Sequence, residues 1–181
     1  GSGAFSINLN TVIATSVTTT RLTSLNDGTL YLIDGSLTTG SLVAAEGTTV
    51  TGSGVLNGAI AFDPNSLLSP GESTGRITVD GDVTFSEGGE LRLGIDGSIT
   101  AGVDYDQLHV TGSGRTVSLF DVTLTLEPGL EFDATVTSTL VLIDMLDATS
   151  SINGQFAGLA EGAELAVGGG TGFLTYAGGA D

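Results

Sequence analysis

The chain of 181 residues carries 21 acidic residues against 4 basic ones, which gives a formal net charge of −17, and it contains no cysteine. Such a charge would repel a nucleic-acid backbone or an anionic membrane surface, so neither is expected as a partner. Without cysteine the chain can form no disulfide, no thiolate metal site and no thiol nucleophile. No apolar run approaches the roughly 18 to 20 residues of a membrane-spanning helix, and membrane insertion is not expected.

The chain is nevertheless predicted to fold. Hydrophobic residues make up 40% of it, which is too many for an acidic disordered tail. Its length fits one domain. The first two residues, Gly1-Ser2, are interpreted as a tag or processing remnant.

Alternation of apolar and polar residues, which is typical of half-buried strands, begins at Phe5-Ser6-Ile7-Asn8-Leu9. It returns in the segments 76–79, 82–85, 90–95 and 122–126. No segment shows a sustained helical period, and the best helical candidate, Ile143 to Thr149, is too short to favour a helix. The pattern therefore predicts an all-β fold.

Glycine separates the expected strands, often after an acidic or amide residue. Examples are Asp27-Gly28, Asp34-Gly35, Glu46-Gly47, Asn57-Gly58, Asp80-Gly81 and Asp96-Gly97. Glycine supplies the positive φ of tight turns, and Asp or Asn caps the turn backbone. Short strands with such frequent turns fit a β-solenoid of stacked coils or, as the alternative, an antiparallel β-sandwich. Short rungs with a glycine at each corner, such as 54–56 and 58–62, favour the solenoid.

A series of motifs between Val50 and Asp181 resembles the autotransporter-associated β-strand repeat. The series begins with the glycine-rich coil 51–58 and the turn Leu68-Ser69-Pro70-Gly71-Glu72-Ser73-Thr74-Gly75, which is its most distinctive member. It continues through the segments 76–85, 89–97, 105–112 and 152–162, and ends with Leu174-Thr175-Tyr176-Ala177-Gly178-Gly179. The first fifty residues match this family only in composition.

This resemblance implies a right-handed parallel β-helix with a more antiparallel C-terminal cap, displayed outside a bacterial cell, and it brings no catalytic residues. We expect β-solenoid coils over residues 3–129 and a capping segment of the same domain over residues 130–181. The interior of the coils is expected to be aliphatic and aromatic. Its predicted members are Ile77, Val79, Val83, Phe85, Leu91, Leu93, Ile95, Leu108 and Val110.

Calcium is the most credible ligand, because acidic turns along a solenoid offer oxygen ligands. The candidates are Asp80 with Asp82 and Asp104 with Asp106, since carboxylates two residues apart share one face of an extended strand. The only histidine, His109, alternates with Leu108 and Val110 and is interpreted as an outward-facing strand residue. No cofactor is expected to be required.

These observations predict a non-enzymatic structural module of a bacterial cell-surface or secreted protein. It would act as a stalk or spacer, or as a self-assembling filament subunit that associates end to end through the strand edges at the solenoid ends. Other surface components are possible partners. The alternative is an adhesin domain whose side face binds a glycan or a protein.

Overall fold

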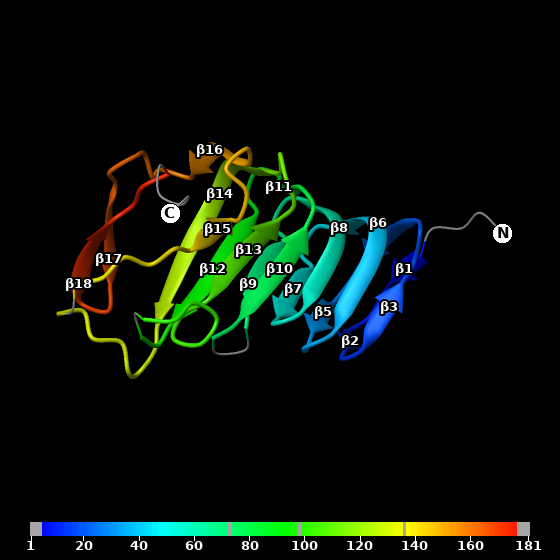
Figure 1. Cartoon of the computed structure of the whole chain (residues 1–181), viewed down its shortest axis with the longest axis horizontal. Coiled ribbons are helices and arrows are strands. Elements are labelled where there is room, and N and C mark those ends of the chain that lie inside the picture. Colours follow the sequence, from blue (N-terminus) through cyan, green and yellow to red (C-terminus); the bar gives the residue numbers. More distant parts are fainter. Residues whose placement is uncertain (1–4, 72–73, 98, 136, 177–181) are drawn as a thin grey trace.

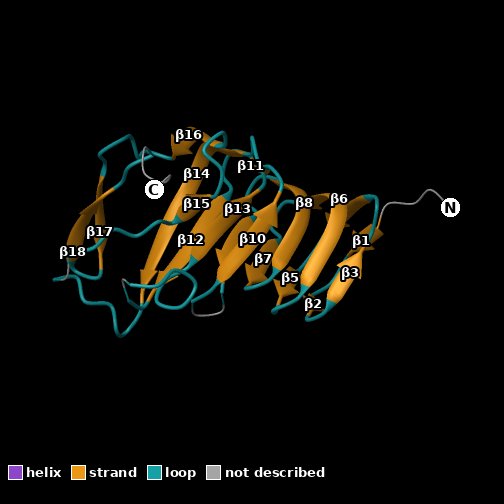
Figure 2. Ribbon diagram, viewed as in Figure 1, coloured by secondary structure: helices purple, strands orange, loops and turns teal. Residues whose placement is uncertain are grey.

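The computed structural model describes residues 5–71, 74–97, 99–135 and 137–176. Within these residues the secondary structure consists of strands and turns, with no helix (Figure 2). The strands wind in successive coils along the long axis of the molecule, from β1 at one end toward β17 and β18 at the other (Figure 1). The all-β prediction is confirmed.

Each coil places strands on three faces, called here A, B and C, which the chain visits in that order. Face A contains β1 (Phe5–Ile7), β4 (Leu22–Leu25), the second half of β6 (Ser36–Ala44), the second half of β8 (Val55–Phe62), β11 (Val83–Phe85), the first half of β14 (Thr116–Pro128), and β16 (Ser151–Phe156).

Faces B and C are built in the same way. Face B contains β2 (Thr11–Ile13), β5 (Thr29–Leu32), β7 (Thr49–Gly52), β9 (Leu67–Pro70), β12 (Glu90–Ile95) and the second half of β14. Face C contains β3 (Ser16–Thr18), the first halves of β6 and β8, β10 (Arg76–Asp80), β13 (Gln107–Thr111) and β15 (Ile143–Met145).

Every strand ladder between successive coils of the described residues is parallel, and this excludes the antiparallel sandwich. Hydrogen bonds between equivalent polar groups of neighbouring early coils join residues 18 to 20 positions apart. In the later coils the same kind of bond spans 34 or 35 positions. The coil thus lengthens along the molecule while the strands remain in register, because the extra residues lie in the connections between faces.

Glycine makes one of these corners possible. Gly58 has a φ of 140° and marks the bend within β8 between faces C and A. A β-carbon there would lie 2.3 Å from the carbonyl oxygen of Thr39 in the preceding coil. An amino acid with a β-carbon could not combine that backbone angle with so close an approach of the neighbouring coil. The expected glycine at the corner of the rung is confirmed at this position.

The core is a stack of inward-facing side chains that runs through all the coils. All nine residues expected in the interior are buried, as the period-two pattern predicts. On face A, Phe62 and Phe85 stack in adjacent coils with ring centroids 4.6 Å apart and ring planes within 10° of parallel. Stacked equivalent positions therefore place like side chains in direct contact from one coil to the next.

The C-terminal segment departs from the expected boundary at residue 129. Within residues 130–181, β15 and β16 still pair in parallel with β13 and β14, so coil stacking extends to Phe156. Only the following segment leaves the coil. It forms the antiparallel hairpin of β17 (Glu164–Val167) and β18 (Gly170–Phe173), which is the antiparallel cap that the family resemblance implies. The short helical candidate at 143–149 begins with β15 instead, because its first residues complete face C.

Some sequence predictions fall outside the residues that the structure describes. These are the remnant Gly1-Ser2, Glu72-Ser73 of the Ser-Pro-Gly turn, and the Ala177-Gly178-Gly179 ending. The start of that turn is described, and Gly71 has the positive φ of 79° that a turn residue needs.

We expect Phe85→Ala to lower the free energy of unfolding by about 3–5 kcal/mol, because it removes a fully buried ring and its stacking partner cannot fill the gap. Urea unfolding followed by circular dichroism measures the change. Thr84→Ala, on the exposed side of the same strand, is the matched control and should change stability by no more than about 0.5 kcal/mol. Equal losses for the two variants would contradict the stacked core.

Candidate functional site

The first coil has unpaired strand edges. Each of β1, β2 and β3 has a single strand neighbour among the described residues, in β4, β5 and β6 respectively. Apolar side chains of this coil are accessible, with Val12 59% and Leu9 75% exposed. This end of the solenoid, called here the open end, is the outermost coil beside the N-terminus in Figure 1.

Hydrogen bonding within β2 shows which backbone groups the open end presents. The carbonyl oxygen of Ile13 accepts from the N–H of Ile33 in the next coil at 3.0 Å. Residues of a parallel strand direct their N–H and C=O groups alternately to one neighbour and to the other. The N–H and C=O of Val12 therefore point away from β5 and toward the open end. Such a row of free donors and acceptors is a template for pairing with another strand.

The opposite end is covered by the hairpin, which Tyr176 holds against the last coil. The Tyr176 hydroxyl donates to the carbonyl oxygen of Leu159 at 2.7 Å and accepts from the N–H of Phe156 at 2.9 Å. The rings of Tyr176 and Phe156 also lie 6.1 Å apart in a tilted arrangement. Burial raises the pKa of Tyr176, so the hydroxyl keeps its proton and its donor role in neutral solution. The two ends of the solenoid are therefore unlike.

The first pair of calcium candidates, Asp80 and Asp82, flanks the corner between faces C and A. Asp80 accepts from an Arg115 Nη2 at 3.0 Å, and Asp82 accepts from the backbone N–H of Thr116 at 3.0 Å. Both bonds reach into the next coil, so each carboxylate ties two coils together. Their observed partners are a cation and a backbone donor.

The second pair, Asp104 and Asp106, belongs to the connection between faces B and C. Asp104 accepts from the N–H groups of Ile99 and Thr100 at 3.2 and 2.7 Å. Asp106 accepts from the N–H of Gly75 at 2.6 Å and from that of Gly94 at 2.7 Å. Among the described residues, no group of three or more acidic or histidine side chains is arranged to hold a metal ion. The structure therefore does not bring the two pairs together.

Asp106 is a strongly perturbed carboxyl among the described residues. It is 2% exposed, and burial raises its pKa from 3.8 to about 7, with the negative charges of Glu127 and Asp96 acting in the same direction. The two backbone N–H donors lower the pKa but do not outweigh the loss of solvation. The position of Asp106 explains why the loss of solvation is tolerated. Its carboxylate accepts hydrogen bonds both from Gly75, just before β10, and from Gly94 in β12, which belongs to the coil after that of β10.

His109 lies on the outer side of face C, as the sequence predicted. Its Nδ1 is 2.7 Å from Oδ2 of Asp144, which occupies the equivalent position in the next coil. The contact is therefore a rung-to-rung pair between stacked strands. No serine, second histidine or further carboxylate completes a catalytic arrangement around it in the described contacts.

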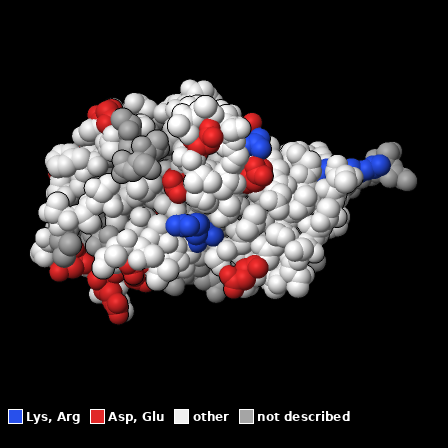
Figure 3. Space-filling model, viewed as in Figure 1, with Lys and Arg blue, Asp and Glu red and all other residues white. Residues whose placement is uncertain are grey.

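Charge is unevenly distributed over the molecule. In the view of Figure 3, acidic side chains gather beneath the ends of β12 and β14, whereas the visible face of the first coils shows basic atoms near the N-terminal end and little acidic surface. Asp96, Asp104, Glu131 and Asp133 line a surface hollow in that region. Of these four, the sequence reasoning singled out only Asp104. Asp96 follows β12 and Glu131 and Asp133 follow β14, so the β12–β14 ladder brings these three to the same edge.

No protein-family model, no curated protein and no solved structure matches this chain. The resemblance to the autotransporter-associated repeat therefore stays a prediction from motifs. Among the described residues there is no helix long and apolar enough to cross a membrane.

The raised pKa of Asp106 predicts a pH-dependent stability. In the unfolded chain its carboxyl loses its proton near pH 3.8, but in the folded chain only near pH 7. The folded state thus binds more protons between these values, and the free energy of unfolding falls as the pH rises from about 4 to about 7. Each unit of pKa difference contributes about 1.4 kcal/mol.

Asp106→Asn isolates this contribution. An amide presents only one acceptor oxygen to the N–H groups of Gly75 and Gly94, so we expect a loss of roughly 1–3 kcal/mol at neutral pH. Urea unfolding across pH 4 to 8 should also show a shallower pH slope in the variant. Asp133→Asn, which alters a fully exposed carboxyl, is the control for the general charge effect. Identical slopes in the wild type and the Asp106 variant would rule out titration of Asp106 in this range.

Proposed function

We propose that the chain is a non-enzymatic structural module, a stalk or spacer, that associates through the strand edges of its open end. The observation that carries the proposal is the first described coil, in which β1, β2 and β3 each have one strand neighbour among the described residues. A further β-coil placed there would continue three ladders at once and would bury exposed apolar side chains such as Val12.

The stacked architecture suits a spacer. In a solenoid each coil contacts only its neighbours, so length can be added without redesign of the core. The described coils already tolerate spacings from 18 to 35 positions between bonded equivalent residues. A rod built in this way separates its two ends by a distance that is set by the number of coils.

The setting of the module is part of the same proposal. We infer a bacterial cell-surface or secreted location, and the support for this location is the motif resemblance. The high negative charge keeps a strand-rich chain soluble and discourages nonspecific pairing of edges. Calcium bridging between modules is the proposed role of any divalent cation, with exposed acidic side chains as its ligands.

Val12→Pro tests the open end. Proline removes the N–H that points away from β5 and leaves the β2–β5 ladder intact, because β5 bonds to Ile13. Sedimentation velocity over a dilution series, with calcium and with a chelator, should show concentration-dependent association of the wild type. The proline variant should sediment as a monomer at every concentration.

Val12→Thr is the matched control, since threonine keeps both the strand propensity and the backbone donor. It should associate like the wild type. A wild type that is monomeric under all conditions would overturn association between copies through this end. Loss of association in both variants would instead assign it to the valine side chain and not to the strand edge.

A further inference from the structure

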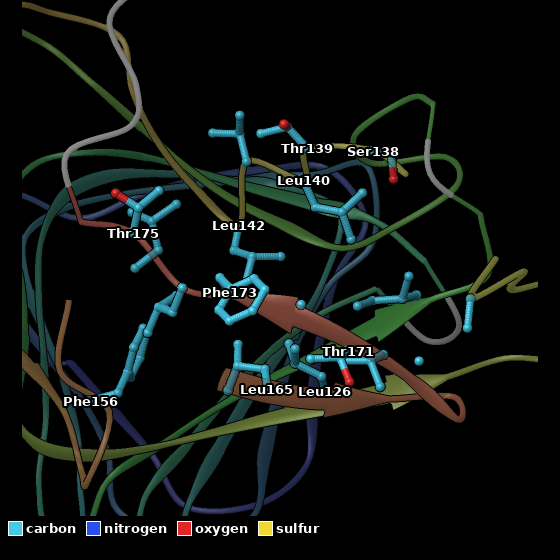
Figure 4. A pocket seen from close by; sticks show the side chains of 18 of the residues that line it. Leu126, Ser138, Thr139, Leu140, Leu142, Phe156, Leu165, Thr171, Phe173 and Thr175 are labelled. Carbon is cyan, nitrogen blue, oxygen red and sulfur yellow. The ribbon is translucent and has the colours of Figure 1, made fainter. Parts of the chain in front are cut away.

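An apolar cavity of about 530 Å³ lies between the last coil and the hairpin of β17 and β18. Leu126, Ile152 and Phe156 line it on the coil side, and Leu165, Gly172 and Leu174 line it on the hairpin side. Residues 138–143, which enter β15, form a third wall. Figure 4 shows side chains from these three segments converging on one space.

The inner face of the hairpin has one open position beside the cavity, at Gly172. The burial pattern alternates along β18, with Gly170 and Gly172 turned inward and Thr171 and Phe173 outward. A β-carbon built on Gly172 would meet no atom within 4 Å, and its φ lies outside the left-handed region. Gly172 is therefore not required by the backbone or by crowding. Glycine at this position leaves space that a larger residue would fill.

The lining of the cavity is uncharged. None of the residues around it is acidic or basic, although the chain carries 21 acidic residues. Its polar side chains are those of Ser138, Thr139 and Thr175, together with the engaged hydroxyl of Tyr176, whereas Thr171 borders the cavity from the outer side of β18. Phe173 also lines the cavity and is 74% exposed, which places it at the open side.

We propose that this cavity binds an uncharged, mainly hydrocarbon ligand. Its volume falls within the range of small-molecule sites, about 300–1,000 Å³. An ion would lose its hydration shell without gaining a charged partner, and an anion would in addition meet the field of a net charge of −17. A hydrocarbon chain or ring system gains by leaving water, and a terminal hydroxyl or ester would bond to the hydroxyls of Ser138 and Thr139.

Two other occupants fit less well. The terminal residues Ala177-Gly178-Gly179-Ala180-Asp181 offer only two methyl groups and carry a carboxylate, so they supply little apolar surface for a site of this size. A second copy of the chain would have to insert a side chain past the hairpin, and its occupancy would rise with protein concentration. The experiment distinguishes both from a free ligand.

The neutral fluorophore 1-N-phenylnaphthylamine is a suitable probe, since its emission increases in an apolar site. Titration into the full chain should give saturable binding with one site per chain. Decanol should displace the probe. Decanoate should compete at least about tenfold more weakly, because its ionised carboxylate would lose hydration on binding that this uncharged lining cannot replace. Binding should also raise the midpoint of thermal unfolding.

Gly172→Val tests whether the probe binds in the cavity. Valine suits a strand and directs its methyl groups into the open space, so probe affinity should fall by at least about tenfold. Ala166→Val is the matched control, because Ala166 lies on the exposed side of β17 opposite Thr171 and does not line the cavity. It should bind the probe like the wild type.

Gly172→Ala provides a graded intermediate in case the valine variant does not fold, which circular dichroism will show. Its affinity should lie between those of the glycine and valine forms. The proposal is overturned if the probe does not saturate, or if the Gly172 and Ala166 variants bind it equally. It is also overturned if apparent affinity falls as protein concentration rises and dimers appear, since a second copy would then occupy the cavity.

Discussion

The parallel ladder between coils is the constraint on which the rest of this structure depends. Every strand must pair in register with the equivalent strand of the next coil, so that side chains at equivalent positions point inward. Extra residues can enter only where the chain leaves one face for the next. This explains why the insertion after β12 and the lengthened coils leave the stacks of Leu56, Val79 and Val110 uninterrupted.

Two sets of buried polar side chains lie at corners between faces. Thr23 and Thr39 are buried and lie 2.9 Å apart between their hydroxyl oxygens. Thr39 also donates toward the carbonyl oxygens of Arg21 and Ser41, at the point where the β6–β8 register shifts. Asp106 has the corresponding role between faces B and C. In both places a side chain supplies the hydrogen bonds that the interrupted ladder cannot, and a buried polar group is acceptable because it is satisfied.

The sequence was sufficient for the features that depend on local periodicity. Alternation identified β10, β11, β12 and their buried side chains, and glycine identified corners such as Gly58. It could not reveal contacts made across a coil, because the distance between equivalent residues changes along the chain. Asp106 was singled out as a calcium ligand from its spacing to Asp104, whereas its observed partners are backbone groups 12 and 31 positions away.

The cavity was hidden for a similar reason. The apolar run Leu140-Val141-Leu142-Ile143 lies within the segment 130–181 that is expected to form the cap, and it lines the space beneath the hairpin. Nothing local indicates that the opposite wall has an open position, because Gly172 is an ordinary strand glycine until β18 is placed opposite the last coil. The cavity depends on how the hairpin and the last coil face each other, and no single segment of the sequence contains both surfaces.

The unlike ends of the solenoid limit the kind of assembly that it can form. A filament requires the exposed end of one copy to pair with the opposite end of the next, but there the hairpin and Tyr176 occupy the place of a further coil. Two copies that meet through their open ends would instead pair their strands antiparallel about a two-fold axis. Such a contact uses the same surface on both copies and closes at two. Continued growth would require the hairpin to detach, and the Tyr176 hydroxyl bonds to Phe156 and Leu159 are the contacts that would have to break first.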